Sequence, residues 1–226
     1  AAGVEGTGHI QSHIVAADAH DAAAQADVQI LGTDHIDTNG VSGTGIFTHG
    51  PELQAWGGVV QVVPHGNGDG NPIDLMVEPT YRLMDMLEQY NQRLTIMADV
   101  AEILCFHRYW QQTGRDDFHV QEVEQQLCDA IRRGHDVQLH VHSSYFKAAW
   151  NGEHFDQCIE EYNMAALSYE RITEMVSQSV KYLENLLQPI QSDYKVWLFR
   201  AANWSMMPTP TLYQVLVEHG ITHDTS

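Results

Sequence analysis

Two histidines, His140 and His142, close a segment in which apolar and polar residues alternate, Gly-His-Asp-Val-Gln-Leu-His-Val-His at 134–142. This alternation has the period of two that is typical of a β-strand, so both imidazoles are expected to project from the same face. Neighbouring imidazoles at the end of a strand suit a divalent metal ion. The same pair could instead line a polar cleft or bind backbone groups without a metal, so the pattern alone leaves two interpretations open.

A regular alternation of strands and helices is predicted around this segment. Short β-branched or apolar runs indicate the strands, and apolar residues three and four positions apart indicate the helices. The expected strands are 94–99, 134–142, 196–199 and one that begins at Ile221, and the expected helices are 79–90, 119–133, 169–187 and 211–218. An aromatic-rich stretch at 144–165 interrupts the alternation. This order predicts an α/β protein with parallel strands, either open or closed into a barrel.

The first third of the chain has weaker signals. Short strands are expected at 10–17, 28–31 and 59–63, and the glycine-rich stretch 38–50 is expected to form loops or a hairpin. Neither an internal repeat nor a linker divides the sequence. We therefore expect a single domain over residues 1–226.

Acidic residues dominate the charge of this 226-residue chain, because 30 Asp and Glu face 11 Lys and Arg, for a formal net charge of −19. A surface of this kind repels phosphate groups, so nucleic acid is not an expected partner. No apolar run reaches the roughly 20 residues of a membrane span, and no signal-peptide pattern opens the sequence. We expect a cytoplasmic protein without membrane insertion, with a secreted mature form as the alternative. The three cysteines are expected to be reduced.

Four segments, taken in order, resemble the motifs of the polysaccharide deacetylases, the carbohydrate esterases with NodB homology. The resemblance is strongest to a divergent branch that is encoded with surface-polysaccharide biosynthesis. The segments are Leu-Thr-Ile-Met-Ala-Asp at 94–99, the histidine segment at 134–142, Phe-Arg-Ala-Ala-Asn-Trp at 199–204 and Gly-Ile-Thr-His-Asp-Thr-Ser at 220–226. Residues 78–226, about two-thirds of the chain, match well, whereas 1–77 match poorly. The order and spacing of the four segments make the resemblance specific, since each alone is a weak signal.

This resemblance implies a distorted (β/α) barrel, incomplete at the C-terminus, with its chemistry at the carboxyl ends of the strands. It also implies a hydrolase that removes an acetyl group from a sugar or polysaccharide, using a divalent metal ion, with zinc as the first choice. In the family one aspartate and two histidines hold the metal. His140 matches the first of these histidines. The usual second position, four residues later, is Ser144 here, so His142 would take its place.

The resemblance further implies a pair of acids in the poorly matched first third and an arginine near the site. Asp34 is the first choice for the metal-binding aspartate and Asp37 for the catalytic base. Asp69 is the first rival for this acidic motif, and Asp18 is the second. Arg200 would orient the catalytic aspartate.

Three further residues are assigned to the substrate groove, Asp99, Trp150 and Trp204. Aromatic faces stack on sugar rings, although the aromatic stretch would equally suit a satellite core at the end of a barrel. For Asp99 the alternative is a solvated acid or a helix cap. His107 and His135 are assigned to structural roles.

Departures from the family pattern keep a second interpretation open. Ser144 replaces the expected histidine, and Ala202 replaces the glycine that usually follows the arginine. The chain could therefore be a catalytically silent relative that binds glycans. An incomplete barrel would also expose strand edges, which predicts a homo-oligomer or a partner chain that covers them, as in a structural subunit of an assembly.

Overall fold

The computed structural model describes residues 29–30, 35–37, 52–56, 59–63, 71–202 and 206–226, and for the ranges before residue 71 it describes the backbone alone. The strand predicted at 10–17 lies outside these ranges. The strand predicted at 28–31 corresponds to β1 (Gln29–Ile30), and the one predicted at 59–63 is confirmed as β4 (Val59–Val63).

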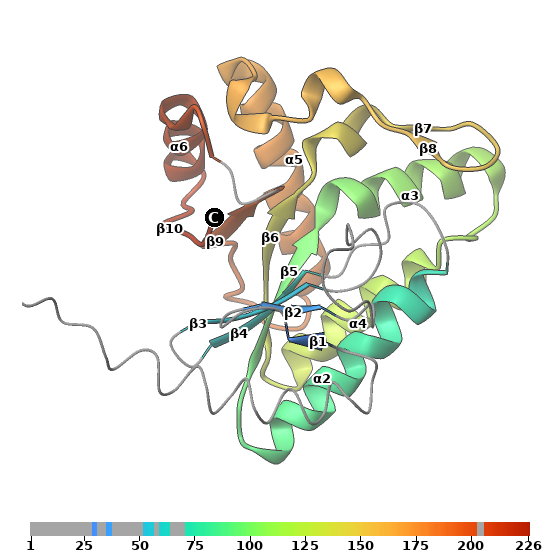
Figure 1. Ribbon diagram of the computed structural model, residues 1–226, viewed down its shortest axis with the longest axis vertical. Coiled ribbons are helices and arrows are strands. Elements are labelled where there is room, and N and C mark those ends of the chain that lie inside the picture. The colour runs from blue at the N-terminus through green and yellow to red at the C-terminus, as the bar shows by residue number, and fades with distance from the viewer. Residues whose placement is uncertain (1–28, 31–34, 38–51, 57–58, 64–70, 203–205) are drawn as a thin grey trace, which may run out of the picture.

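An eight-stranded sheet forms the centre of the described structure, in the order β1-β2-β3-β4-β5-β6-β9-β10 (Figure 1). β1 to β4 pair antiparallel, whereas β4, β5, β6, β9 and β10 run parallel. The remaining bounds are β2 (His35–Asp37), β3 (Glu52–Trp56), β5 (Leu94–Asp99), β6 (Asp136–Val141), β9 (Leu198–Ala201) and β10 (His223–Asp224). A separate two-stranded hairpin pairs β7 (Ala149–Trp150) with β8 (Phe155–Asp156).

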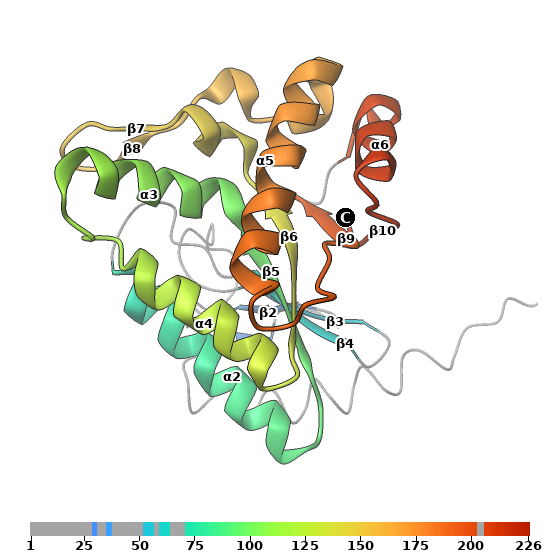
Figure 2. The ribbon, with the colours of Figure 1, turned by 180° about the vertical axis from the view of Figure 1, so that it is seen from behind.

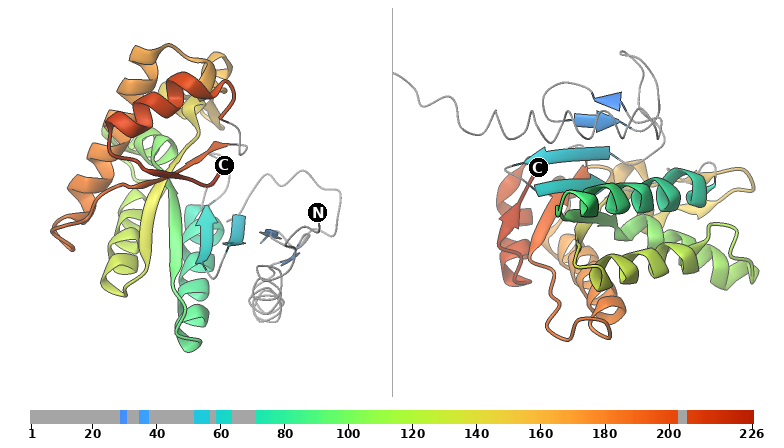
Figure 3. Two further views of the ribbon diagram at one scale, coloured as in Figure 1. Left: turned by 90° about the vertical axis from the view of Figure 1, so that its left-hand side faces the viewer. Right: turned by 90° about the horizontal axis from the view of Figure 1, so that it is seen from below.

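Amphipathic helices cover one face of this sheet (Figures 2 and 3). They are α2 (Glu78–Gln89), α3 (Val100–Thr113), α4 (Val120–Arg132), α5 (Tyr169–Leu187) and α6 (Thr209–Glu218). The predicted bounds of α5 are confirmed, and those of α2, α4 and α6 differ by one or two residues. The sequence prediction missed α3 and β3. It also placed β9 two residues too early. In the structure β9 is Leu198–Ala201, and Arg200 lies inside the strand.

The α/β class with parallel strands is confirmed, and the distorted (β/α) barrel, incomplete at the C-terminus, remains a prediction. Among the described residues, the pairing runs in one order from β1 to β10, and no pair joins the two ends. Helices long and apolar enough to cross a bilayer are absent from the part of the chain that the structure describes.

The two faces of the parallel strands carry different side chains. Val137, Leu139 and Val141 of β6 are at most 1% exposed and belong to the main apolar core beneath the helices. Met97 and Leu198 form a separate small apolar cluster. Because side chains alternate along a strand, Gln138 and His140 share this second face rather than the helical one. Gln138 and His140 therefore lie on the face opposite the helices.

His135 has a structural role at the start of β6, as predicted. Its Nδ1 accepts the Leu94 N–H at 3.0 Å, and its Nε2 donates to Glu88 at 2.9 Å. The Leu94 bond requires an unprotonated Nδ1, so the ring is neutral. Burial lowers the pKa of His135 and outweighs the attraction of Glu88, which raises it.

Replacing His135 with alanine is expected to cost about 2 kcal/mol of unfolding free energy, because buried partners lose their hydrogen bonds. A folded pKa below the unfolded value means that the stabilising contribution of His135 is present above about pH 6.5 and falls as the pH drops. Urea unfolding at about pH 7.5 and about pH 5.5 measures this. The wild type should lose more stability between these pH values than His135→Gln, which does not titrate. Equal losses would contradict the assignment of a neutral ring.

Candidate metal centre

Three polar residues form one row across the carboxyl ends of three neighbouring parallel strands. Asp99 of β5 pairs with His140 of β6, and His140 pairs in turn with Arg200 of β9. Because paired residues on parallel strands point to the same face, their side chains converge on the face away from the helices. All three are at most 3% exposed. The sheet register therefore brings together residues that lie about 40 and 60 positions apart in the sequence.

Asp99 closes β5 and begins α3. Its Oδ1 accepts the Glu102 N–H at 3.5 Å as the N-cap of the helix, and it also accepts the His142 N–H at 3.1 Å. The other oxygen, Oδ2, lies 2.6 Å from Nδ1 of His142. Burial alone would raise the pKa of Asp99, but the charge and hydrogen bonds of His142 outweigh it and hold the pKa well below its usual range. The carboxylate is therefore ionised and acts as an acceptor.

Hydrogen bonds at Nδ1 determine the tautomer of both histidines. Nδ1 of His140 lies 2.8 Å from the carbonyl oxygen of Arg200, which can only accept, so this nitrogen carries the proton. The Asp99 carboxylate places the proton of His142 on Nδ1 in the same way. In the neutral form each ring then has its lone pair on Nε2. The rings lie edge to face with centroids 4.6 Å apart, which confirms the expected side-by-side placement.

This donor set fits a divalent metal ion. Asp99, His140 and His142 each offer a ligand atom, and these atoms lie within 4.8 Å of one another. Imidazole nitrogens and a carboxylate form the ligand set of many zinc sites. Histidines that bind metals usually donate their other ring N–H to a carboxylate or a backbone carbonyl, and these are the two partners present here.

The distance between Asp99 and His142 bears on the role of the acid. Two ligands of a tetrahedral zinc ion, each bonded at about 2.0–2.2 Å, lie roughly 3.3–3.6 Å apart. The observed 2.6 Å between Oδ2 and Nδ1 is that of a charge-assisted hydrogen bond. This geometry favours Asp99 as the carboxylate that orients His142, with Nε2 of the ring available to face an ion.

The other predicted site residues are placed differently. Arg200 lies in the row, with its side chain 1% exposed. Asp37 ends β2, and two strands, β3 and β4, separate β2 from β5. Trp150 is partly buried in β7, where its ring contacts Tyr109, Phe118 and Phe155 at centroid distances of 5.1–5.6 Å. Asp34 and Trp204 lie outside the described residues, as do the rivals Asp69 and Asp18.

The contact between Asp99 and His142 was missed from the sequence, where Asp99 was assigned to the substrate groove. One signal was present, because Asp99 and Glu102 stand at the spacing of a helix-capping pair. A cap at Asp99 would have fixed the end of the strand beside the histidines. Ser144, at the position expected for a histidine, is 1% exposed and donates to Gln157 Oε1 at 2.7 Å. It is therefore part of the loop packing.

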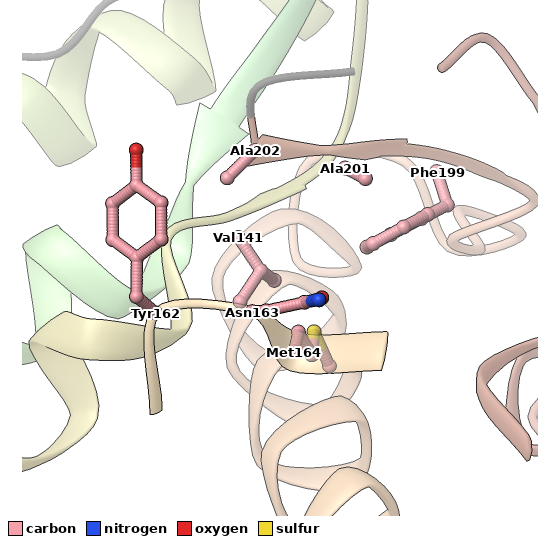
Figure 4. A pocket seen from close by; sticks show the side chains of 7 residues that line it. All are labelled: Val141, Tyr162, Asn163, Met164, Phe199, Ala201 and Ala202. Carbon is pink, nitrogen blue, oxygen red and sulfur yellow. The ribbon is translucent and has the colours of Figure 1, made fainter. Parts of the chain in front are cut away.

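A cavity of about 380 Å³ lies on the other side of the sheet (Figure 4). The residues that line it are Val141, Tyr162, Asn163, Met164, Phe199, Ala201 and Ala202. Val141 alternates with His140 and His142 along the strand, and Ala201 alternates with Arg200. The cavity is therefore on the helical face and is separate from the row of polar side chains.

Comparisons with known proteins give one distant similarity. No family model matches the sequence, and no curated protein matches it. Among solved structures the chain is similar to a family 4 carbohydrate esterase from Streptomyces lividans in complex with acetate, with a TM-score of 0.40 and 14% sequence identity. The similarity covers 65% of this chain, and the chain spans 55% of the length of that esterase.

Proposed function

We propose that this chain is a metal-dependent hydrolase that removes an acetyl group from a sugar or polysaccharide. The observation that supports it best is the cluster of Asp99, His140 and His142, whose ligand atoms lie within 4.8 Å of one another at the carboxyl ends of β5 and β6. Sites of α/β proteins with parallel strands are commonly found at this edge of the sheet. The sequence motifs that resemble polysaccharide deacetylases suggest the acetyl group and the carbohydrate.

His140 and His142 would hold the ion through Nε2, and zinc is the first choice. A divalent ion in this position supplies Lewis acidity, which polarises an acetyl carbonyl and lowers the pKa of water. The chain itself would contribute by orienting the two imidazole rings toward the ion. The Arg200 carbonyl and the Asp99 carboxylate fix the two rings, and β5, β6 and β9 fix those acceptors.

An acid from the first third of the chain completes the proposed ligand set. Asp34 with Asp37 is one candidate pair. In a flat sheet, β2 would lie about 14 Å from β5, because β3 and β4 stand between them. Asp69 follows the end of β4, Val63, by six residues, and β4 is paired directly with β5. The strand order therefore favours Asp69 over Asp34, with Asp18 as the remaining candidate.

Arg200 is proposed to orient the catalytic base. That base would be Asp37 if the acidic motif is Asp34 with Asp37, or an acid of the segment around Asp69 if the motif lies there. Arg200 as a residue is 1% exposed, and a buried guanidinium forms its strongest hydrogen bonds with carboxylates. The base would remove a proton from the attacking water. Trp204, three residues beyond the end of β9, is proposed as the aromatic platform for a sugar ring, and Trp150 is the second candidate.

Metal content and acetyl release test this function together. The purified protein is expected to contain close to one zinc per chain by elemental analysis. It should also release acetate from an acetylated chitooligosaccharide or a chromogenic acetyl ester. A chelator should abolish the release, and added zinc should restore it. Protein that stays free of metal after incubation with zinc, cobalt, nickel and manganese would contradict the proposal.

A catalytically silent, glycan-binding relative is the second candidate. It is favoured by Ser144, which stands where a metal histidine is expected and is buried in a hydrogen bond to Gln157. This candidate predicts binding of oligosaccharides without acetyl release from any of them. Release that depends on the metal ion would contradict it.

A further inference from the structure

His142 is the first residue after the end of β6. The last pair between β6 and β9 joins Val141 to Ala201, so the ladder holds His140 but not His142. The side chain of His142 is 20% exposed, and its carbonyl accepts the Tyr145 N–H at 3.0 Å. Asp99 and the short 3-10 helix that follows, η2 (Ser143–Lys147), therefore both help to position His142.

Ser143 connects this helix to the segment around Glu161. The Ser143 side chain is fully buried, and its hydroxyl donates to the carbonyl of Glu161 and, at 3.3 Å, contacts that of Tyr162. Glu161 belongs to a second 3-10 helix, η3 (Ile159–Glu161), which contacts η2. The backbone of Glu161 is therefore joined by a hydrogen bond to the residue beside His142.

Three contacts with cationic groups hold the carboxylate of Glu161, whose side chain is 7% exposed. Arg171, in the first turn of α5, binds both oxygens, with Nε at 3.0 Å and the outer nitrogen at 2.7 Å. Lys147, the last residue of η2, lies 2.5 Å from Oε1. Burial raises the pKa of Glu161, but the hydrogen bonds with Arg171 and Lys147 outweigh it and lower the pKa. One carboxylate thus ties η2 and η3 to a long helix of the core.

Two arginines of the neighbouring helices also contact η2 directly. Arg108 of α3 donates to the carbonyl of Tyr145 at 2.7 Å and lies 3.5 Å from that of Ala148. The Arg171 guanidinium also lies over the Phe146 ring, 5.8 Å from its centroid. The segment after His142 is thereby attached to both α3 and α5.

We propose that Glu161 is a positioning residue of the metal centre, which acts through Ser143 to keep the His142 imidazole facing the proposed ion. This inference rests on the proposed function for its consequence, since the ion is what the imidazole would bind. Its structural core is the link from Arg171 through Glu161 and Ser143 to His142, which can be measured without any metal.

Two variants break this link at different points. Glu161→Gln removes the charge that Arg171 and Lys147 share, and Ser143→Ala removes the hydroxyl but leaves the ion pairs in place. Glu88→Gln is the matched control. Glu88 also accepts from an arginine and from a second side chain, Arg133 at 2.8 Å and the neutral His135 at 2.9 Å, but it lies beside the start of β6.

Amide hydrogen exchange in metal-free protein is the first measurement. Glu161→Gln and Ser143→Ala are expected to speed the exchange of the His142 amide, which donates to Asp99, by about tenfold or more. Glu88→Gln should leave that rate unchanged and speed exchange near Leu94. An unchanged rate in Ser143→Ala overturns the inference, even where Glu161→Gln fails to fold.

Affinity for cobalt, followed by its visible absorption, is the second measurement. A loss of about 10- to 100-fold is expected for Glu161→Gln and Ser143→Ala, with no loss for Glu88→Gln. Equal losses of cobalt affinity in all three variants would mean that Glu161 only stabilises the fold, and would overturn the inference. If the wild type binds no cobalt, the proposed function fails, while the exchange rates still decide whether Glu161 positions His142.

Discussion

Replacing His140 with alanine is expected to remove the metal ion from the protein and to lower kcat/KM for acetyl release by about 10³-fold or more. His140 lies in the middle of the row, paired with Asp99 on one side and Arg200 on the other, and its Nδ1 is held by a backbone carbonyl. Loss of a ligand should exceed the 10- to 100-fold cost that is usual for residues that only support one.

His135→Ala is the matched control for this substitution. Both histidines are buried; His135 directly precedes β6, and His140 lies near its carboxyl end. His135→Ala is expected to lower stability but to leave the metal content and kcat/KM of the folded protein unchanged. Elemental analysis, together with thermal unfolding, separates the two effects. A His140→Ala protein that keeps one zinc per chain, or a His135→Ala protein that loses it, would contradict the proposed site.

The helices with wide apolar stripes could be predicted from the sequence, whereas α3 could not. In α5, buried residues recur at Ile172, Val176, Leu183 and Leu187, and both ends carry clear signals. β5 passes into α3 without a loop, because Asp99 is both the last residue of the strand and the cap of the helix. The usual turn residues are therefore missing at this boundary, and the apolar run continues across it.

In the candidate site too, features set by one strand could be predicted from the sequence, whereas contacts between strands could not. The common face of His140 and His142 follows from the period of a single strand, so it could be predicted. The contact between Asp99 and His142 depends on the register of β5 against β6, which no local pattern encodes. The acceptor for His140 is the backbone carbonyl of Arg200, and a carbonyl group has no signature in a sequence.

Replacing Asp99 with asparagine is expected to weaken metal binding by about 10- to 100-fold. It is also expected to lower kcat/KM for acetyl release. Asparagine is a good helix cap and keeps an oxygen for the N–H groups of Glu102 and His142, so α3 should remain folded. Its amide NH2 group, however, would face the Nδ1–H of His142 at a position where the wild type has a 2.6 Å hydrogen bond. Two donors repel each other, and the ring is expected to adopt the other tautomer, with the proton on Nε2.

The tautomer of His142 can be measured directly by nitrogen-15 NMR of the imidazole in metal-free protein. The wild type should carry its proton on Nδ1 and Asp99→Asn on Nε2, whereas Asp136→Asn, the control at the start of β6, should resemble the wild type. The size of the metal loss then distinguishes two roles for Asp99. A loss of about 10- to 100-fold fits a carboxylate that orients His142. A complete loss, as expected for His140→Ala, would make Asp99 itself the ligand and would remove the need for an acid from the first third of the chain.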